Sequence, residues 1–334
     1  MTIVLAYTFV IVLLTCVLVA LGTVYLMRRP HEERFRNADK DKKYLVIVSQ
    51  WGMANRLRTY SVGYEIAMRS GRELIGVNDR AEASAYKSFW GGDWSKIVSM
   101  PITIVDESYV EGKDIVFIGS ENEDCGVTLT LADDVLAEPN ASARYMGIES
   151  CEIVVPDLDF SNTFYGQIKP TDAVMALMQE TLDKILGHDL VVGVHIRQGN
   201  ISDYHQKYFF GEWEHDGNDN DLPLMCCYED TSKNLSSCSR QVVGIERYLD
   251  AMRNEPEHAR FFVCSDRPGC ILAVEQAFPG KLIYNSITID HDVDFVRGFC
   301  DWWCLANCKK MLLSSASSFS IEAAKVRGAE TVLI

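Results

Sequence analysis

Positive charge is scarce in this sequence. Its 32 lysines and arginines are outnumbered by 47 aspartates and glutamates, which gives the 334 residues a formal net charge of −15. This balance argues against nucleic acid as the main partner, because a polyanion needs a basic surface. Fixed-period repeats and low-complexity tracts are also missing, as is any G-x-G-x-x-G stretch, the fingerprint of a dinucleotide site. What remains, with 48% hydrophobic residues, is the composition of a folded globular protein.

An apolar run opens the chain. Ile3–Met27 contains no charged residue, and Arg28 and Arg29 follow it directly. A run of this length spans a bilayer as a helix. A cleaved signal peptide is the alternative, but the run is longer than a usual signal core and lacks a small-x-small cleavage site. We therefore predict a transmembrane anchor at residues 3–27, followed by a polar, charge-dense stem at residues 28–43.

The residues leave the orientation of this anchor open. The two arginines after it favour a cytosolic position for the rest of the chain by the positive-inside rule. Three N-x-S sequons, at Asn140, Asn200 and Asn234, would instead be usable in a secretory lumen, although sequons also arise by chance.

Seven of the eleven cysteines fall into two groups. Cys264 lies in an apolar, strand-like run, and Cys300, Cys304 and Cys308 recur every four residues on one face of a predicted helix. Buried free thiols explain these, because a zinc site would need a fourth ligand. Three others bracket a polar loop that they would cross-link in an oxidising compartment: Cys226, Cys227 and Cys238.

From Tyr44 onward, short apolar runs alternate with amphipathic stretches. This alternation predicts parallel βαβ units, and the number of strands is enough for two doubly wound sheets of an α/β protein. A helix-start signal at residues 170–172 divides the chain into predicted domains 44–170 and 171–334. The predicted strands are Tyr44–Ser49, Glu73–Val77, Ile102–Val105, Asp114–Ile118, Val191–Arg197, Arg260–Cys264, Lys281–Asn285, Met311–Ser314 and Thr331–Ile334. The predicted helices are Ala54–Arg69, Ser84–Phe89, Asp172–Leu186, Val242–Arg253, Gly269–Phe278, Asp292–Asn307 and Phe319–Val326.

The segment Val191–Asn200 carries the clearest functional signal. It predicts a buried strand that presents His195 and Arg197 in the loop at its carboxyl end. Open α/β sheets bind ligands at that end, and a fixed guanidinium there suits a phosphate. An ordinary surface arginine is the alternative, and the segment alone does not decide between the two.

Two other segments also follow predicted strands and open helices. In Gly52–Leu57, a glycine turn leads to Asn55 and Arg56, where a helix amino end suits an anion or a sugar hydroxyl. A plain turn with Asn55 as helix cap is the alternative. Ser314–Ser320 offers five hydroxyls at a helix start, more than an ordinary cap would use.

Two acidic features complete the candidates. Asp266 follows the strand Arg260–Cys264, where its carboxylate would accept hydrogen bonds from a base or a ribose. Capping of the next helix explains Asp266 equally well. The stretch Glu212–Asp221 lacks the spacing of an EF-hand loop, and we predict a solvated loop near the acceptor entrance rather than a metal site.

Together, three segments resemble the motifs of GDP-fucose-dependent fucosyltransferases. Gly-x-x-Asn-Arg-Leu at residue 52, His-x-Arg-x-Gly-Asx at residue 195 and Ser-Ser-Phe-Ser at residue 317 occur in the order found in the α-1,2-, α-1,6- and protein O-fucosyltransferase superfamily, which includes bacterial nodulation fucosyltransferases. Cys308–Ser320 is similar to the final motif of that family, and the matching order covers Leu45–Gly328.

The resemblance implies a GT-B architecture of two facing Rossmann-like domains. It implies GDP-fucose as the donor, no bound metal, a glycan or glycoprotein acceptor, and a luminal position in the Golgi or endoplasmic reticulum. It further implies that Arg197 grips the β-phosphate of the donor, and that Asn55 and Arg56 line the cleft from the other domain. The residues implied to hold the nucleotide are His195, Asp266, Ser317, Ser318, Phe319 and Ser320.

One position departs from the family pattern. The motif usually has aspartate after the glycine, whereas this chain has Asn200, which cannot act as a base. Asp203 is close in sequence, but an exposed loop residue is its simpler reading, and no residue is a convincing general base. Besides an inverting fucosyltransferase, two alternatives therefore stay open: a non-catalytic nucleotide- or sugar-binding relative, and a glycosyltransferase that uses another nucleotide sugar.

Overall fold

The computed structural model describes residues 42–49, 52–78, 94–119, 126–150, 152–158, 163–197, 243–265, 268–285, 294–314 and 317–334. Several predictions lie outside these ranges, namely the anchor at 3–27, the stem up to residue 41, the helix Ser84–Phe89, and the residues Asn200, Asp203, Glu212–Asp221, Cys226, Cys227, Cys238 and Asp266. Within the described ranges, no helix combines the length and the apolar character needed to cross a bilayer.

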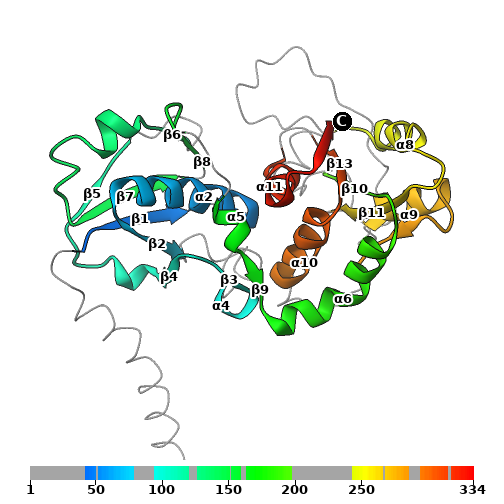
Figure 1. Cartoon of the computed structure of the whole chain (residues 1–334), viewed down its shortest axis with the longest axis horizontal. Helices are drawn as coiled ribbons and strands as arrows, with labels where there is room; N and C mark the ends of the chain where they lie inside the picture. Colours follow the sequence, from blue (N-terminus) through cyan, green and yellow to red (C-terminus); the bar gives the residue numbers. More distant parts are fainter. Residues whose placement is uncertain are drawn as a thin grey trace, which may run out of the picture. The chain divides into compact units, whose positions relative to one another are not determined.

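Two five-stranded parallel sheets organise the described residues (Figure 1). The first sheet has the order β4-β2-β1-β7-β5 and the second has the order β12-β11-β10-β13-β14. The strands of the first sheet are β1 (Tyr44–Ser49), β2 (Glu73–Asn78), β4 (Thr103–Asp106), β5 (Ile115–Phe117) and β7 (Tyr145–Ser150). The strands of the second are β10 (Val191–Ile196), β11 (Arg260–Ser265), β12 (Leu282–Ile283), β13 (Lys310–Leu313) and β14 (Glu330–Leu333).

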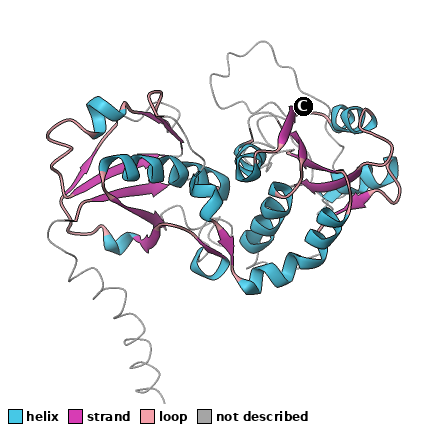
Figure 2. Ribbon diagram, viewed as in Figure 1, coloured by secondary structure: helices cyan, strands magenta, loops and turns pink. Residues whose placement is uncertain are grey.

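Helices connect these strands, and the colours of Figure 2 show the alternation of strand and helix along the chain. The described α-helices are α2 (Met53–Ser70), α4 (Trp94–Ile97), α5 (Thr163–Gln167), α6 (Asp172–Gly187), α8 (Ile245–Arg253), α9 (Pro268–Ala277), α10 (Asp294–Ala306) and α11 (Ser318–Arg327). The shorter elements are β3 (Val98–Ser99), paired antiparallel with β9 (Lys169–Pro170), β6 (Gly126–Thr128), paired parallel with β8 (Glu152–Val154), the 3-10 turn η1 (Glu107–Tyr109) and the π-helical turn η2 (Leu131–Val135).

The prediction of a parallel α/β fold is confirmed, and every predicted strand has a counterpart within a few residues. Tyr44–Ile334 forms one compact unit that contains both sheets, so the division at residue 170 stays a prediction. One main strand was not predicted: β7 pairs with β1 over all six residues. Its sequence hides it, because Gly147 and Glu149 interrupt the apolar pattern. Gly147 is needed there, since a Cβ atom at this position would stand 2.7 Å from the Cγ2 atom of Ile115 on β5.

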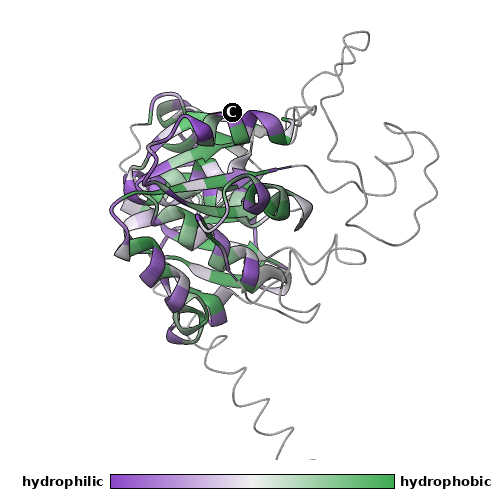
Figure 3. Ribbon diagram, turned by 90° about the vertical axis from the view of Figure 1, so that its right-hand side faces the viewer, coloured by the Kyte–Doolittle hydropathy of each residue, from purple (hydrophilic) through white to green (hydrophobic). Residues whose placement is uncertain are grey.

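The central strand of the second sheet is buried at all six of its positions, from Val191 to Ile196. Burial of both faces is typical of a parallel strand covered by helices, and it explains the uninterrupted apolar run in the sequence. The hydropathy colours of Figure 3 show the same division, with green strands inside and purple residues on the outer helices. The helix α2 packs on the first sheet, α10 packs on the second, and α11 packs against both α2 and α10.

Candidate nucleotide-sugar site

The carboxyl ends of β10 and β13 lie at the point where the strand order of the second sheet reverses. The chain runs from β10 outward to β12 on one side, then returns to β13 and β14 on the other. Ligands of open α/β sheets bind outside the carboxyl ends of the strands at this switch point. Arg197 follows β10 directly, and Ser314 follows β13. Two of the three predicted motif segments therefore meet at one edge of one sheet.

A single hydroxyl connects the two strand ends. The Oγ atom of Ser314 donates to the carbonyl of His195 at 2.8 Å and accepts from the amide of Arg197 at 2.9 Å. It also lies 2.6 Å from the hydroxyl of Tyr248 on α8. On the other side of β10, the Oγ atom of Ser265 donates to the carbonyl of Ile196 at 2.8 Å. These contacts fix the backbone from which the guanidinium of Arg197 projects.

The structure corrects the predicted position of His195. We predicted that the carboxyl end of the strand presents His195 in a loop, but His195 lies inside β10 and is only 4% exposed. The strand continues because residues 191–196 pair with β11 over their full length. The imidazole stacks on Phe319 of α11, with ring centroids 4.8 Å apart. Among the described residues, its Nδ1 atom has no hydrogen-bond partner, so one polar atom of the ring is available to a ligand.

Burial lowers the pKa of His195 to about 3, and the positive charge of Arg197 lowers it further. The ring is therefore neutral at physiological pH and can offer a ligand one hydrogen bond but no charge. Arg197 supplies a positive charge at this edge of the sheet, and His195 is a polar, stacked neighbour.

This shift predicts a loss of stability in acid. An unfolded histidine has a pKa near 6.5, so below that pH the unfolded state takes up a proton that folded His195 excludes. Above pH 6.5 His195 leaves the free energy of unfolding unaffected, and below it that free energy declines as the pH falls toward 3. The expected loss between pH 7 and pH 5 is about 2 kcal/mol. Urea denaturation of the wild type and His195→Gln at both pH values measures it, and an equal decline in the two proteins would contradict the assignment.

The first turn of α11 presents the serines of the third motif. Ser317 is the N-cap residue, yet its side chain makes no capping hydrogen bond. Ser320 is fully buried, and its hydroxyl has no partner among the described residues. Ser318 and Phe319 are half-buried. An ordinary cap therefore does not account for these hydroxyls, and a buried hydroxyl left unpaired is costly unless a ligand or water pairs it.

Asn55 and Arg56 lie in the first turn of α2, and both are buried. The N-cap of this helix is Gly52, so the alternative in which Asn55 caps it is wrong. The Oδ1 atom of Asn55 has no partner among the described residues. Burial raises the pKa of Tyr60 to about 12, although the nearby charge of Arg56 opposes the shift. The Arg56 side chain therefore lies close to Tyr60 of its own helix.

The structure thus brings together Arg197, His195 and the turn Ser317–Ser320. Asn55 and Arg56 are on α2, which packs against α11. This helix contact connects them to the other three parts of the site. Sequence analysis missed the supporting residues Tyr248 and Ser265. Tyr248 looks like one more large residue on the apolar face of α8, and Ser265 like the last residue of a strand.

Cys300 and Cys304 on α10, with Cys308 just beyond its end, are all buried, as expected for free thiols. The three are free cysteines, and burial raises the pKa of Cys300 to about 12. Across the described ranges, no three metal-ligating side chains cluster together. Trp302 and Trp303 are also buried, and both contact the ring of Phe299, Trp303 stacked on it and Trp302 tilted against it.

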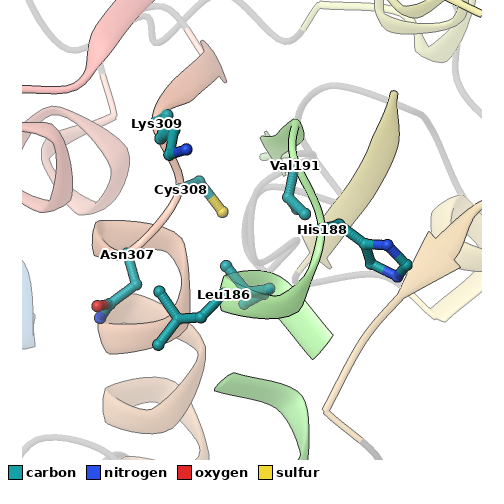
Figure 4. A pocket seen from close by; sticks show the side chains of 7 residues that line it. Leu186, His188, Val191, Asn307, Cys308 and Lys309 are labelled. Atoms are coloured by element: carbon teal, nitrogen blue, oxygen red, sulfur yellow. The ribbon is translucent and has the colours of Figure 1, made fainter. Parts of the chain in front are cut away.

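A small surface hollow lies at the opposite edge of the second sheet (Figure 4). Val191, the first residue of β10, and Lys309, which precedes β13, line it together with Leu186 of α6 and His188 just after that helix. It adjoins the amino ends of the strands, where parallel sheets do not place ligands. We therefore do not assign the nucleotide to it.

Comparison with known proteins identifies the fold. Neither a family model nor a curated protein sequence matches the chain. Among solved structures, the fucosyltransferase NodZ from Bradyrhizobium superposes with a TM-score of 0.51 at 14% identity, covering 84% of this chain and 93% of NodZ. The chain has the fold of NodZ. NodZ α-1,6-fucosyltransferase soaked with GDP-fucose gives the same TM-score and identity, over 85% of this chain and 93% of its own.

A more distant likeness is to an Arabidopsis thaliana FUT1 variant in complex with GDP. Its TM-score is 0.49 at 13% identity, covering 89% of this chain and 71% of that protein. With the two parallel sheets, the likeness to NodZ confirms the GT-B-like α/β class predicted from the sequence. At such low identity the likeness establishes the fold, and the activity has to be argued from the site.

Proposed function

We propose that this chain is an inverting glycosyltransferase that transfers fucose from GDP-fucose to a hydroxyl of a glycan or a glycoprotein. One observation carries the proposal: Arg197 and the turn Ser317–Ser320 lie together at the switch point of the second sheet. The same fold in NodZ structures soaked with GDP-fucose or co-crystallised with GDP supports this choice of donor. The order of the three motifs supports it independently.

The chemistry of the site fits this reaction. Breaking the bond between C1 of fucose and its phosphate oxygen leaves the electron pair on the β-phosphate of GDP, while the acceptor hydroxyl attacks C1 from the opposite face and releases its proton to the solvent. Arg197 would bind the β-phosphate and stabilise the charge that develops there in the transition state. The serine hydroxyls and first amides of α11 would hold the remaining phosphate oxygens. Neutral His195 would add a single hydrogen bond without competing for the charge.

Nucleotide binding gives the first test of the proposal. At a GDP concentration 100 times its Kd, binding should stabilise the folded chain by about 2.7 kcal/mol and raise the Tm by roughly 5 °C. UDP at the same concentration should give a clearly smaller shift in a thermal-shift assay. An equal shift with UDP would favour another nucleotide sugar, and no shift with either nucleotide would contradict the proposal.

A second function is favoured by Asn200, which stands where related motifs carry aspartate. A chain that kept the fold but lost turnover would bind GDP and release none from GDP-fucose across a panel of acceptors. Gain of turnover in Asn200→Asp would identify the chain as such a relative, because the substitution restores the carboxylate.

We also propose a single membrane anchor at residues 3–27 and a luminal position for residues 44–334. The apolar run supports the anchor, and the resemblance to fucosyltransferases supports the lumen. The sequon at Asn140 gives a direct test, because it lies in a turn on the protein surface and Ser142 beside it is exposed. A glycosidase-sensitive mass that disappears in Asn140→Gln would place this turn in the lumen, whereas digestion by protease outside sealed microsomes would place it in the cytosol.

A further inference from the structure

A buried polar cluster joins three helices. Glu322 on α11 is fully buried, and the hydroxyl of Tyr165 on α5 donates to its Oε2 atom. The Nζ atom of Lys325 donates to Oε1 and Oε2 of the same carboxylate at 2.8 and 3.0 Å. On α2, Ser61 and Arg58 adjoin the Tyr165 hydroxyl. Burial and the charge of Glu322 raise the pKa of Tyr165, so its hydroxyl keeps its proton and acts as a donor.

The cluster lies close behind both motif turns. Glu322 is two residues beyond Ser320 on α11, and Arg58 is three residues beyond Asn55 on α2. An α-helix is stiff over so short a length, because one turn rises only about 5.4 Å and is held by backbone hydrogen bonds. A shift of Glu322 would therefore be passed on to the serines at the start of α11. Those serines lie beside His195, because Phe319 stacks on its ring.

Packing alone does not require a charged group here. The ring of Tyr165 contacts Phe164 and Trp302, with centroids 5.5 and 6.4 Å away, so its surroundings are largely aromatic. Apolar residues of similar volume often replace a buried ion pair without loss of stability, because desolvation of the charges offsets their attraction. A hydrogen bond to a carboxylate depends on its angle, whereas the contact of a methyl group does not. Such a bond can therefore fix the orientation of the helix that carries the binding turn.

We propose that the Tyr165–Glu322 hydrogen bond is a positioning contact for the donor site. It sets how α11 lies against α5 and α2, and with it the place of the Ser317–Ser320 turn next to Arg197. Both residues are positioning residues that act through the helix rather than by touching the nucleotide. This inference rests on the proposed function, since it assigns the turn to the binding of GDP.

The test compares two tyrosines that each lose only a hydroxyl. Tyr165→Phe removes the contact, whereas Tyr44→Phe removes the hydroxyl of another fully buried tyrosine, at the amino end of β1. Calorimetric titration with GDP should show a Kd at least tenfold higher for Tyr165→Phe and within twofold of wild type for Tyr44→Phe. Glu322→Gln keeps an oxygen acceptor for Tyr165, so its Kd should stay within threefold of wild type.

Melting temperatures measured in the same buffer show whether each variant is folded. If Tyr165→Phe does not fold, Glu322→Leu removes the acceptor at similar volume and should raise the Kd alike. An unchanged Kd in the variant that removes the contact would overturn the inference. An equal rise of the Kd in Tyr44→Phe would also overturn it, because the loss of any buried tyrosine hydroxyl would then weaken GDP binding. If the wild type itself binds no GDP, the proposed function fails, and the role of the contact fails with it.

Discussion

Arg197→Ala is expected to lower the turnover of GDP-fucose by about 100- to 1,000-fold, the usual effect of removing one preorganised group that stabilises a developing charge. Ser314 and Ser265 hold the backbone from which the guanidinium projects, so that part of the site would already be in place when the donor binds. Release of GDP from saturating GDP-fucose is the measurement, because it needs no knowledge of the acceptor. The backbone of the site should keep its structure, because the alanine variant retains the amide that donates to Ser314.

The control for this prediction is Arg197→Lys. Lysine keeps the positive charge but loses the planar fork that binds two phosphate oxygens at once, so its rate should lie between those of the wild type and the alanine variant. Both variants should keep the wild-type Tm within a few degrees, because residue 197 is partly exposed. Wild-type turnover in the alanine variant would remove Arg197 from the reaction and leave it as a surface charge.

Gly193→Val is expected to lower the unfolding free energy by about 3 kcal/mol, at the upper end of the usual range for overpacking. Gly193 is in the middle of β10, under the end of α10. Even a single added Cβ atom would stand 2.7 Å from Cδ1 of Leu305 and 3.1 Å from Cβ of Cys308, and both residues are buried. Valine adds two further methyl groups, so either the helix or the strand must move. Urea denaturation at pH 7 measures the loss.

A glycine on the adjoining helix provides the control. Gly298 is inside α10, and a Cβ atom there would meet nothing within 4 Å. Gly298→Ala should therefore stabilise the chain, by up to about 1 kcal/mol, because alanine is the better helix former. A loss of less than about 1 kcal/mol in Gly193→Val would show that α10 can yield at this point.

Most of the fold was predictable because its strands are chemically simple. Strands β1 and β10 are short and almost entirely apolar runs, and the prediction for β1 matches its observed bounds. Strand β7 was missed although, like β1, it has a partner strand on each side, because its residues suit a sheet only in contact with those partners. Gly147 is useful only where Ile115 of β5 presses against it, and that contact is not visible in the local sequence.

The site was predictable only in part, for a similar reason. Arg197 and Ser317 stand out because they follow apolar strands, and the rule for strand ends then places them together. The end of a strand cannot be read to the nearest residue, which is why His195 was expected in a loop although pairing with β11 keeps it in the sheet. The contact between Tyr165 and Glu322 spans 157 positions, and neither residue lies in a pattern that marks it.

The contacts of the Ser314 hydroxyl also determine when the site can form during synthesis of the chain. Its partners His195 and Arg197 precede it by 119 and 117 positions in the chain, and Tyr248 precedes it by 66. At a synthesis rate of roughly 5–20 residues per second, the arginine leaves the ribosome several seconds before the serine that holds its backbone. During that interval the strand β10 has no β13 beside it, and the turn of α11 does not yet exist. The proposed donor site is therefore complete only after β13 has joined β10 in the second sheet.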